Sequence, residues 1–186
     1  MRVDREIEKL KNDIFSDDWD KMKESANRLF EIGGQSNIDY LVGLLDQPNS
    51  LIRNVVALTF MVNKFNEALE PLLASINKHE NRNARGTMVY ALQALDCSQK
   101  LKELFDILFT ATKNIEVQSG ILTVLEEQEF EFTKTDLVEI RTTWEKLKET
   151  WNDSNGIKEG DVKEYEIDRE AIQDFVDGYV SYLENG

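Results

Sequence analysis

The chain has 186 residues, of which 41% are hydrophobic and 31% charged, a balance typical of a folded soluble domain. Acidic residues outnumber basic ones by 36 to 22, and the resulting formal charge of −14 repels the phosphates of nucleic acids and of anionic lipid surfaces. Nucleic acid and membrane are therefore excluded as expected partners. With no signal core and no apolar run of about 20 residues, the sequence predicts a cytoplasmic protein.

The first two predicted helices form a pair. Apolar residues recur three and four positions apart over residues 2–15, which predicts an amphipathic helix. Ser16 is the expected N-cap of a second helix over 17–32, whose first turn carries three aspartates where the helix dipole favours negative charge. Gly33-Gly34 is expected to end this helix.

The next pair contains the most apolar helix of the chain. Ser36 is the expected cap of a short helix that ends in the Asp-Gln-Pro-Asn sequence of residues 46–49. The helix that follows, over 49–64, is apolar along most of its length and has one arginine, Arg53, near its start. This helix is expected to lie at the centre of the fold.

The third and fourth pairs follow the same plan. Residues 65–78 form a helix with a kink or a late start at Pro71, and a second helix begins near Arg85. Apolar residues over 101–109 and 115–125 then predict two helices joined by only a few residues.

The C-terminal part changes in character. Thr135 is the expected cap of a long helix whose apolar stripe reaches Trp151, and the polar residues 152–166 are expected to form a loop before a last helix. From Asp153 to Gly186 there are ten acidic and three basic residues. We therefore expect a helical repeat array over 1–152, and over 153–186 an acidic loop and a capping helix of the same domain.

A recurring pattern links the second helices of the pairs. Each begins with one of four reference residues, and apolar residues follow three and seven positions later. The reference residues are Lys23, Arg53, Arg85 and Gln118, and they advance by 30, 32 and 33 positions. Self-similarity at this period predicts stacked helix pairs, each unable to bury its apolar face alone.

Three dipeptides, each followed by that apolar pair, resemble the start of the second helices of HEAT-like repeat proteins. They are Ile52-Arg53, Ala84-Arg85 and Val117-Gln118. The resemblance implies an all-α, right-handed α-solenoid of about five antiparallel helix pairs, closed by the C-terminal helix. In such proteins the second helices usually line a concave surface, and that surface usually binds another macromolecule.

Helix geometry predicts which residues such a surface would present. If the apolar positions face the core, then at about 100° per residue the positions one, five and eight after the reference residue lie on the far side. The expected partner-binding residues, with one neighbouring glutamate, are Glu31, Asn54, Leu58, Met61, Tyr90, Gln93, Glu126 and Glu127. They have an apolar and aromatic centre with acidic flanks, as in an interface hot spot with a charged rim. For Leu58 and Met61 the simpler interpretation is favoured, namely that they are core of a central helix buried on both sides.

The residues that could carry other chemistry have simpler structural interpretations. His79, the only histidine, is expected to be a solvated residue rather than a metal ligand or a base. The aspartates of residues 17–20 could hold a cation, although helix capping is favoured. Trp144 and Trp151 could stack on a ring-shaped ligand, although core packing is favoured, and Cys97 is expected to be a small half-buried hydrophobe. No catalytic residue, metal or cofactor is predicted.

Three classes of function follow from this pattern. The favoured one is a non-enzymatic module that binds another protein, and the acidic charge predicts a basic partner. A small acidic chain of this kind looks like a bacterial immunity protein or inhibitor that neutralises a toxin. The alternatives are a HEAT-like enzyme, similar to bilin lyases or base-excision glycosylases, and a structural scaffold or assembly factor.

Overall fold

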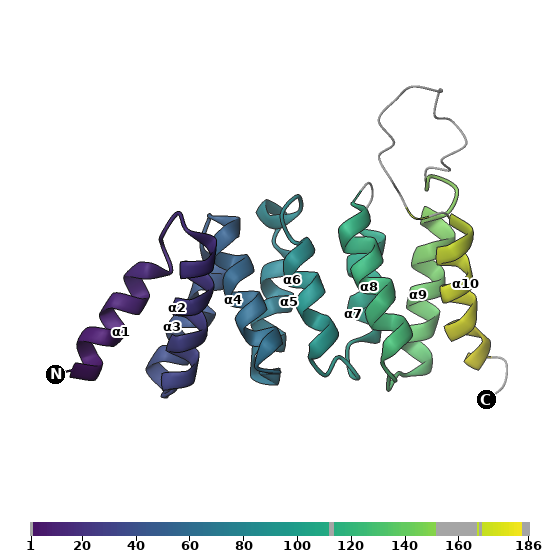
Figure 1. Cartoon of the computed structure of the whole chain (residues 1–186). Helices are drawn as coiled ribbons and strands as arrows, with labels where there is room; N and C mark the ends of the chain where they lie inside the picture. The colour runs from purple at the N-terminus through teal and green to yellow at the C-terminus, as the bar shows by residue number, and fades with distance from the viewer. Residues whose placement is uncertain (1, 112–113, 152–166, 168, 184–186) are drawn as a thin grey trace, which may run out of the picture. The chain divides into compact units, whose positions relative to one another are not determined.

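The computed structural model describes residues 2–111, 114–151, 167 and 169–183, and in this part of the chain all regular secondary structure is helical. The predicted all-α class is thereby confirmed. None of the described helices is long and apolar enough to cross a bilayer. The chain divides into two compact units, Met1–Asp96 and Cys97–Gly186 (Figure 1). The boundary predicted at residue 152 falls inside the second unit, and the acidic loop predicted over 152–166 lies outside the described residues.

The first unit contains six α-helices joined by short turns. They are α1 (Arg2–Asp13), α2 (Trp19–Ile32), α3 (Gln35–Gly43), α4 (Ser50–Val62), α5 (Leu69–Asn77) and α6 (Gly86–Ala91). Four 3₁₀ turns adjoin them, namely η1 (Leu44–Asp46), η2 (Asn66–Ala68), η3 (His79–Asn81) and η4 (Leu92–Ala94). Helix α2 packs on α1 and on α4, and α4 packs on α6, while α3 and α5 both contact η1 (Figure 1).

The core of the first unit contains the apolar positions that the repeat pattern predicts. Four of them have no exposed surface, namely Val56, Phe60, Met88 and Leu92. The ring of Phe60 also meets Phe30 of α2 and Phe65, with ring centroids 6.3 and 5.6 Å apart. The same spacing that makes one face of each helix apolar therefore holds α2, α4 and α6 together.

The start of α2 differs from the prediction. Asp18, not Ser16, is its N-cap, and one carboxylate oxygen of Asp18 accepts the backbone N–H groups of Asp20 and Lys21 at 3.0 and 3.1 Å. Ser16 instead accepts the N–H of Asp18. Since the helix begins two residues later than predicted, only Asp20 lies in its first turn as an acidic residue.

The two glycines between α2 and α3 both have a positive φ, where a side chain would cause strain. Gly33 ends α2, as predicted, and donates its N–H to Phe30. Gly34 is the residue before α3, so the predicted cap, Ser36, lies inside the helix. In α5, Pro71 occupies the first turn, where its missing N–H has no partner to lose, which confirms the late start.

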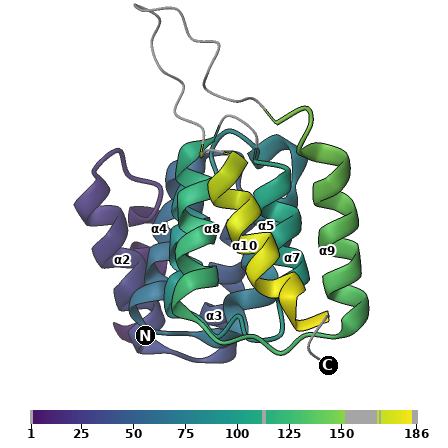
Figure 2. The same cartoon turned by 90° about the vertical axis from the view of Figure 1, so that its right-hand side faces the viewer.

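In the described residues of the second unit there are four α-helices and one 3₁₀ turn. They are α7 (Leu101–Phe109), α8 (Ile115–Glu127), α9 (Lys134–Leu147), α10 (Arg169–Val180) and η6 (Ser181–Leu183). Helix α7 packs on α8 and α9, and α10 packs on α9. Figure 2 shows α10 between α8 and α9, and the Tyr179 hydroxyl of α10 donates to the Leu125 carbonyl of α8 at 3.0 Å.

Two tryptophans form part of the core of the second unit. Trp144 is fully buried and stacks on Phe109 with ring centroids 5.7 Å apart and planes 17° apart. Trp151, also buried, meets Trp144 edge to face at 5.5 Å. The core interpretation of these tryptophans is confirmed, and neither presents a ring face as a stacking platform.

The start of α9 also differs from the prediction. Thr133 is its N-cap, and its hydroxyl accepts the N–H of Asp136 while the Asp136 carboxylate accepts the N–H of Thr133. These two bonds form a capping box. The backbone hydrogen bond from Thr133, followed by the bond from its hydroxyl, lowers the pKa of Asp136. The predicted cap, Thr135, is an exposed residue inside the helix.

Candidate protein-binding surface

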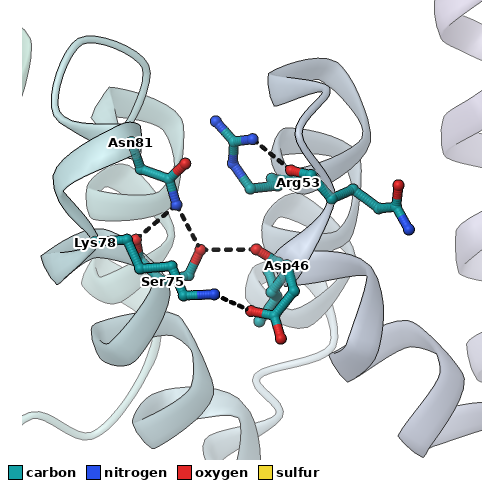
Figure 3. Close-up of polar contacts among 7 residues, drawn as sticks. Asp46, Arg53, Ser75, Lys78 and Asn81 are labelled. Carbon is teal, nitrogen blue, oxygen red and sulfur yellow. Dashed lines mark hydrogen bonds and ion pairs between the residues drawn. The ribbon is translucent and has the colours of Figure 1, made fainter.

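The reference residue of α4 is buried and anchors the helix. Arg53 is only 3% exposed, and its Nη1 donates to the carbonyl oxygens of Gln47 and Pro48 at 2.5 and 2.9 Å (Figure 3 shows the first). Burial lowers the pKa of this guanidinium, an effect that the attraction of Glu80 opposes. Arg53 therefore ties the start of α4 to the turn before it and is not available as a surface charge.

The reference residues of α6 and α8 are buried as well. Arg85 donates from Nη1 to the Ile76 carbonyl at the end of α5, at 3.2 Å. Gln118 of α8 has no exposed surface and accepts the N–H of Ile167 at 2.9 Å. Lys23 of α2 departs from this pattern, because its ammonium group is partly exposed and pairs with Asp20. The recurring residue thus has a structural role wherever it is buried.

A second polar network joins the turn after α3 to α5. The Ser75 hydroxyl donates to the Leu45 carbonyl at 2.8 Å, and the Asn81 amide donates to both the carbonyl and the hydroxyl oxygen of Ser75 (Figure 3). An ion pair between Lys78 and Asp46 lies beside it. Buried hydrogen bonds of this kind fix neighbouring elements in one register. They hold η1, α5 and η3 of the first unit together.

The central residues of the predicted strip lie at the surface of the first unit. Tyr90 of α6 is 50% exposed, and Leu58 and Met61 of α4 are half-buried. Leu58 and Met61 are thus neither fully buried nor fully exposed, and their assignment to an interface stays a prediction. Asn54 and Gln93 are partly exposed too. Helix α4 packs directly on α6, and the helical period places each of these side chains on the side of its own helix that faces away from the core.

Two apolar residues of α4 belong to the same surface but were not predicted. Leu51 and Val62 are 51% and 66% exposed. Counted from Arg53 at about 100° per residue, they lie at the edge of the face that contains Leu58 and Met61. The helical period could have identified them, but the prediction stopped at the three central positions. Their exposure widens the apolar surface along α4.

The acidic flank on α2 is partly neutralised within the chain. Arg28 pairs through Nε with Glu6 of α1 at 3.1 Å and through Nη1 with Glu31 at 3.2 Å. The hydrogen bond that Arg28 donates to Glu6, and then the one it donates to Glu31, raises the pKa of Arg28. Glu31 thus already has a cationic partner, while Glu24 on the same helix is also exposed. Over the whole of α2, three acidic residues are balanced by three basic ones, so the helix has no net charge.

The other predicted flank belongs to the second unit. Glu126 and Glu127 are exposed at the end of α8. The predicted residues on α2, α4 and α6 belong to the first unit, and Glu126 and Glu127 are described only within the second. Their place beside the apolar centre remains a prediction.

The residues considered for other chemistry have the following surroundings. His79 is exposed in η3, Asp18 caps α2, and Cys97 is buried. Across residues 2–111, 114–151, 167 and 169–183, no group of three or more histidine, cysteine or acidic side chains is arranged to hold a metal ion.

Comparison of the chain with protein-family models, with curated proteins and with solved structures gave no match. The similarity to HEAT-like repeats therefore remains a prediction from the sequence.

Proposed function

We propose that this chain is a non-enzymatic protein-binding module that uses the apolar surface of α4 and α6 to hold a basic protein. In this proposal the helix pairs form a HEAT-like, right-handed α-solenoid of about five antiparallel pairs, the second helices line its concave side, and the protein acts in the cytoplasm. A narrower form of the proposal is an immunity protein or inhibitor that neutralises a basic toxin.

The observation that carries the proposal is the exposure of Tyr90 beside the apolar face of α4. A tyrosine is among the side chains that most often dominate binding energy at interfaces, because its ring buries a large area at little entropic cost. Four more apolar side chains share this side of the two helices, namely Leu51, Leu58, Met61 and Val62. Exposed apolar side chains that share one side of a helix on a folded chain support an interaction site there.

Charge indicates the nature of the partner. The chain carries a formal charge of −14, and exposed carboxylates of Glu24 and Glu31 adjoin the apolar surface on α2. Opposite charge on a partner accelerates encounter, and a few buried anchor residues then determine how slowly the complex dissociates. A basic protein with an apolar patch fits both features.

The direct test compares the wild-type chain with a Met61→Glu, Tyr90→Glu double variant. Proteins captured from the native host by the wild-type chain are identified by mass spectrometry, and the binding of each purified candidate is then measured. We expect a basic partner whose affinity falls at least about 30-fold in the double variant, as for the loss of a hot spot. The association rate should also fall as salt rises from low to physiological concentration.

A matched control separates this surface from a general effect of charge. The Val3→Glu, Phe15→Glu double variant adds the same two charges at apolar residues of the first unit that are 55% and 49% exposed. This control should bind like the wild-type chain. Equal binding by the Met61→Glu, Tyr90→Glu variant would refute the proposal. A large loss of helical circular dichroism in that variant would also refute it, because Met61 and Tyr90 would then be structural residues.

A further inference from the structure

The C-terminal helix of the second unit carries an open hollow on one face. It has a volume of about 400 Å³ and is lined by Asp174, Phe175, Gly178, Tyr179 and Tyr182. Along α10 and η6 these residues are separated from one another by one, three or four positions, so they lie on one side of the helix. Three of the five have aromatic rings, and one carries a carboxylate.

Other residues of the second unit contact the two tyrosine rings that line the hollow. The Tyr179 hydroxyl donates to the Leu125 carbonyl at 3.0 Å, and its ring meets Phe105 and Phe132 edge to face at 5.6 and 6.1 Å. The exposed ring of Tyr182 meets Phe132 at 5.4 Å. Because these contacts fix the rings before any ligand arrives, little conformational entropy is lost on binding.

Gly178 provides the depth of the hollow. Its φ is not in the left-handed region, and a Cβ built on it would meet no atom within 4 Å. Neither the backbone nor the packing of the described residues therefore requires glycine at this position. A glycine inside a helix destabilises it relative to alanine. Its effect here is to leave space among Phe175, Tyr179 and Tyr182.

The chemistry of the lining favours a cation with an aliphatic stem. Aromatic faces attract cations through the ring quadrupole, and they bury methylene groups at the same time. The exposed carboxylate of Asp174 can accept a hydrogen bond from an ammonium or guanidinium group. Lysine and arginine side chains combine these two properties.

We propose that the hollow over Gly178 binds a lysine or arginine side chain of a basic protein, as a binding site of the second unit in its own right. The site does not depend on the surface of α4 and α6. Its residues belong to α10 and η6 alone, so the two sites can be tested and can fail separately.

The test uses the full chain, labelled with ¹⁵N, in nuclear magnetic resonance titrations with N-acetyl-arginine amide and N-acetyl-lysine amide. The control ligand is N-acetyl-norleucine amide, which has a comparable aliphatic stem and no charge. We expect saturable shifts of the amides of residues 174–182, with at least about 5-fold tighter binding of the cationic ligands. Equal binding of norleucine amide, or the absence of saturable shifts there, would overturn the proposal.

Variants of α10 test the site without unfolding it. Gly178→Leu fills the hollow and replaces a poor helix former by a good one, so the variant should melt at or above the wild-type temperature and lose the saturable shifts. Asp174→Asn should weaken the binding of arginine amide at least about 3-fold. Asp177→Asn is the matched control, because Asp177 has the same charge and accepts a hydrogen bond from Gln173 outside the hollow.

The outcomes of these variants are distinct. Unchanged binding by Gly178→Leu would overturn the proposal. An equal effect of Asp177→Asn and Asp174→Asn would also overturn it, because the ligand would then respond to the net charge of the helix and not to the carboxylate of Asp174. The Met61→Glu, Tyr90→Glu variant should bind arginine amide like the wild-type chain. A failure of the surface on α4 and α6 would leave this result unchanged.

Discussion

The buried arginine of α4 offers the sharpest test of how the first unit is held together. Arg53→Ala removes the two hydrogen bonds from Nη1 to the carbonyl oxygens of Gln47 and Pro48, and it removes the packed aliphatic stem. Arg53→Met removes the hydrogen bonds but keeps most of the stem. Arg28→Ala is the control, since Arg28 is also paired but is exposed.

The expected magnitudes follow from burial. A hydrogen bond from a charged donor contributes about 1.5–3 kcal/mol, while burying the guanidinium charge offsets part of the gain from the two bonds. With the lost packing added, we expect Arg53→Ala to lower the free energy of unfolding by about 2–3 kcal/mol, and Arg53→Met by about 1 kcal/mol. For the exposed ion pairs of Arg28 the expected loss is much smaller than for Arg53→Ala, because solvent screens them.

Urea unfolding followed by circular dichroism at 222 nm measures these differences. A loss of 2–3 kcal/mol corresponds to a decrease of roughly 5–10 °C in the melting temperature of a chain of this size. Hydrogen exchange should show the loss of protection in residues 47–62. If Arg53→Ala costs no more than Arg28→Ala, the anchoring role of the buried arginine is refuted. If Arg53→Met costs as much as Arg53→Ala, the stem contributes nothing.

Two further predictions concern polar groups at other positions. Asn54→Ala should raise the free energy of unfolding by about 0.5–1.5 kcal/mol. The Oδ1 atom of Asn54 is buried and none of the described residues donates a hydrogen bond to it, and alanine also favours the helix. A lower urea midpoint for the variant would contradict this prediction. Burial, and then the nearby Tyr182, raises the pKa of Tyr179 from 10.0 to about 12. Since the unfolded chain then loses its proton first, stability should fall as the pH rises from 10 to 12. Unfolding at a series of pH values should show a smaller fall for Tyr179→Phe, and an equal fall would contradict the assignment.

The core of each unit could be predicted because a helix repeats its side-chain directions with a fixed period. Val56 and Phe60 of α4, Met88 of α6 and Leu92 of η4 follow from spacing alone, and they are fully buried. The role of Arg53 could not be predicted in the same way. A recurring arginine indicates a repeated position, but whether it faces solvent or backbone carbonyls depends on where the preceding turn runs.

The helix starts show a different limit. Ser16 and Asp18 are both residues that cap helices, and the choice between them depends on the path of the chain before α2. In contrast, the true start of α9 was visible in the sequence. Thr133 and Asp136 have the spacing of a capping box, with aspartate in the place of the usual glutamate, whereas Thr135 does not combine with a residue three positions later in this way.

The hollow on α10 shows why a helical period alone misses some binding sites. The period assigns Phe175 and Tyr179 to the apolar stripe, and the sequence therefore predicts only packing for them. An aromatic ring, however, is large enough to contact the core with one part and to line a surface hollow with another. Tyr179 contacts Phe105 and also lines the hollow beside Gly178. Where a glycine lies at the border of an apolar stripe, the absent side chain leaves the neighbouring rings partly uncovered. Such borders are therefore where a concave site can form on a single helix without loss of the packing that holds it in place.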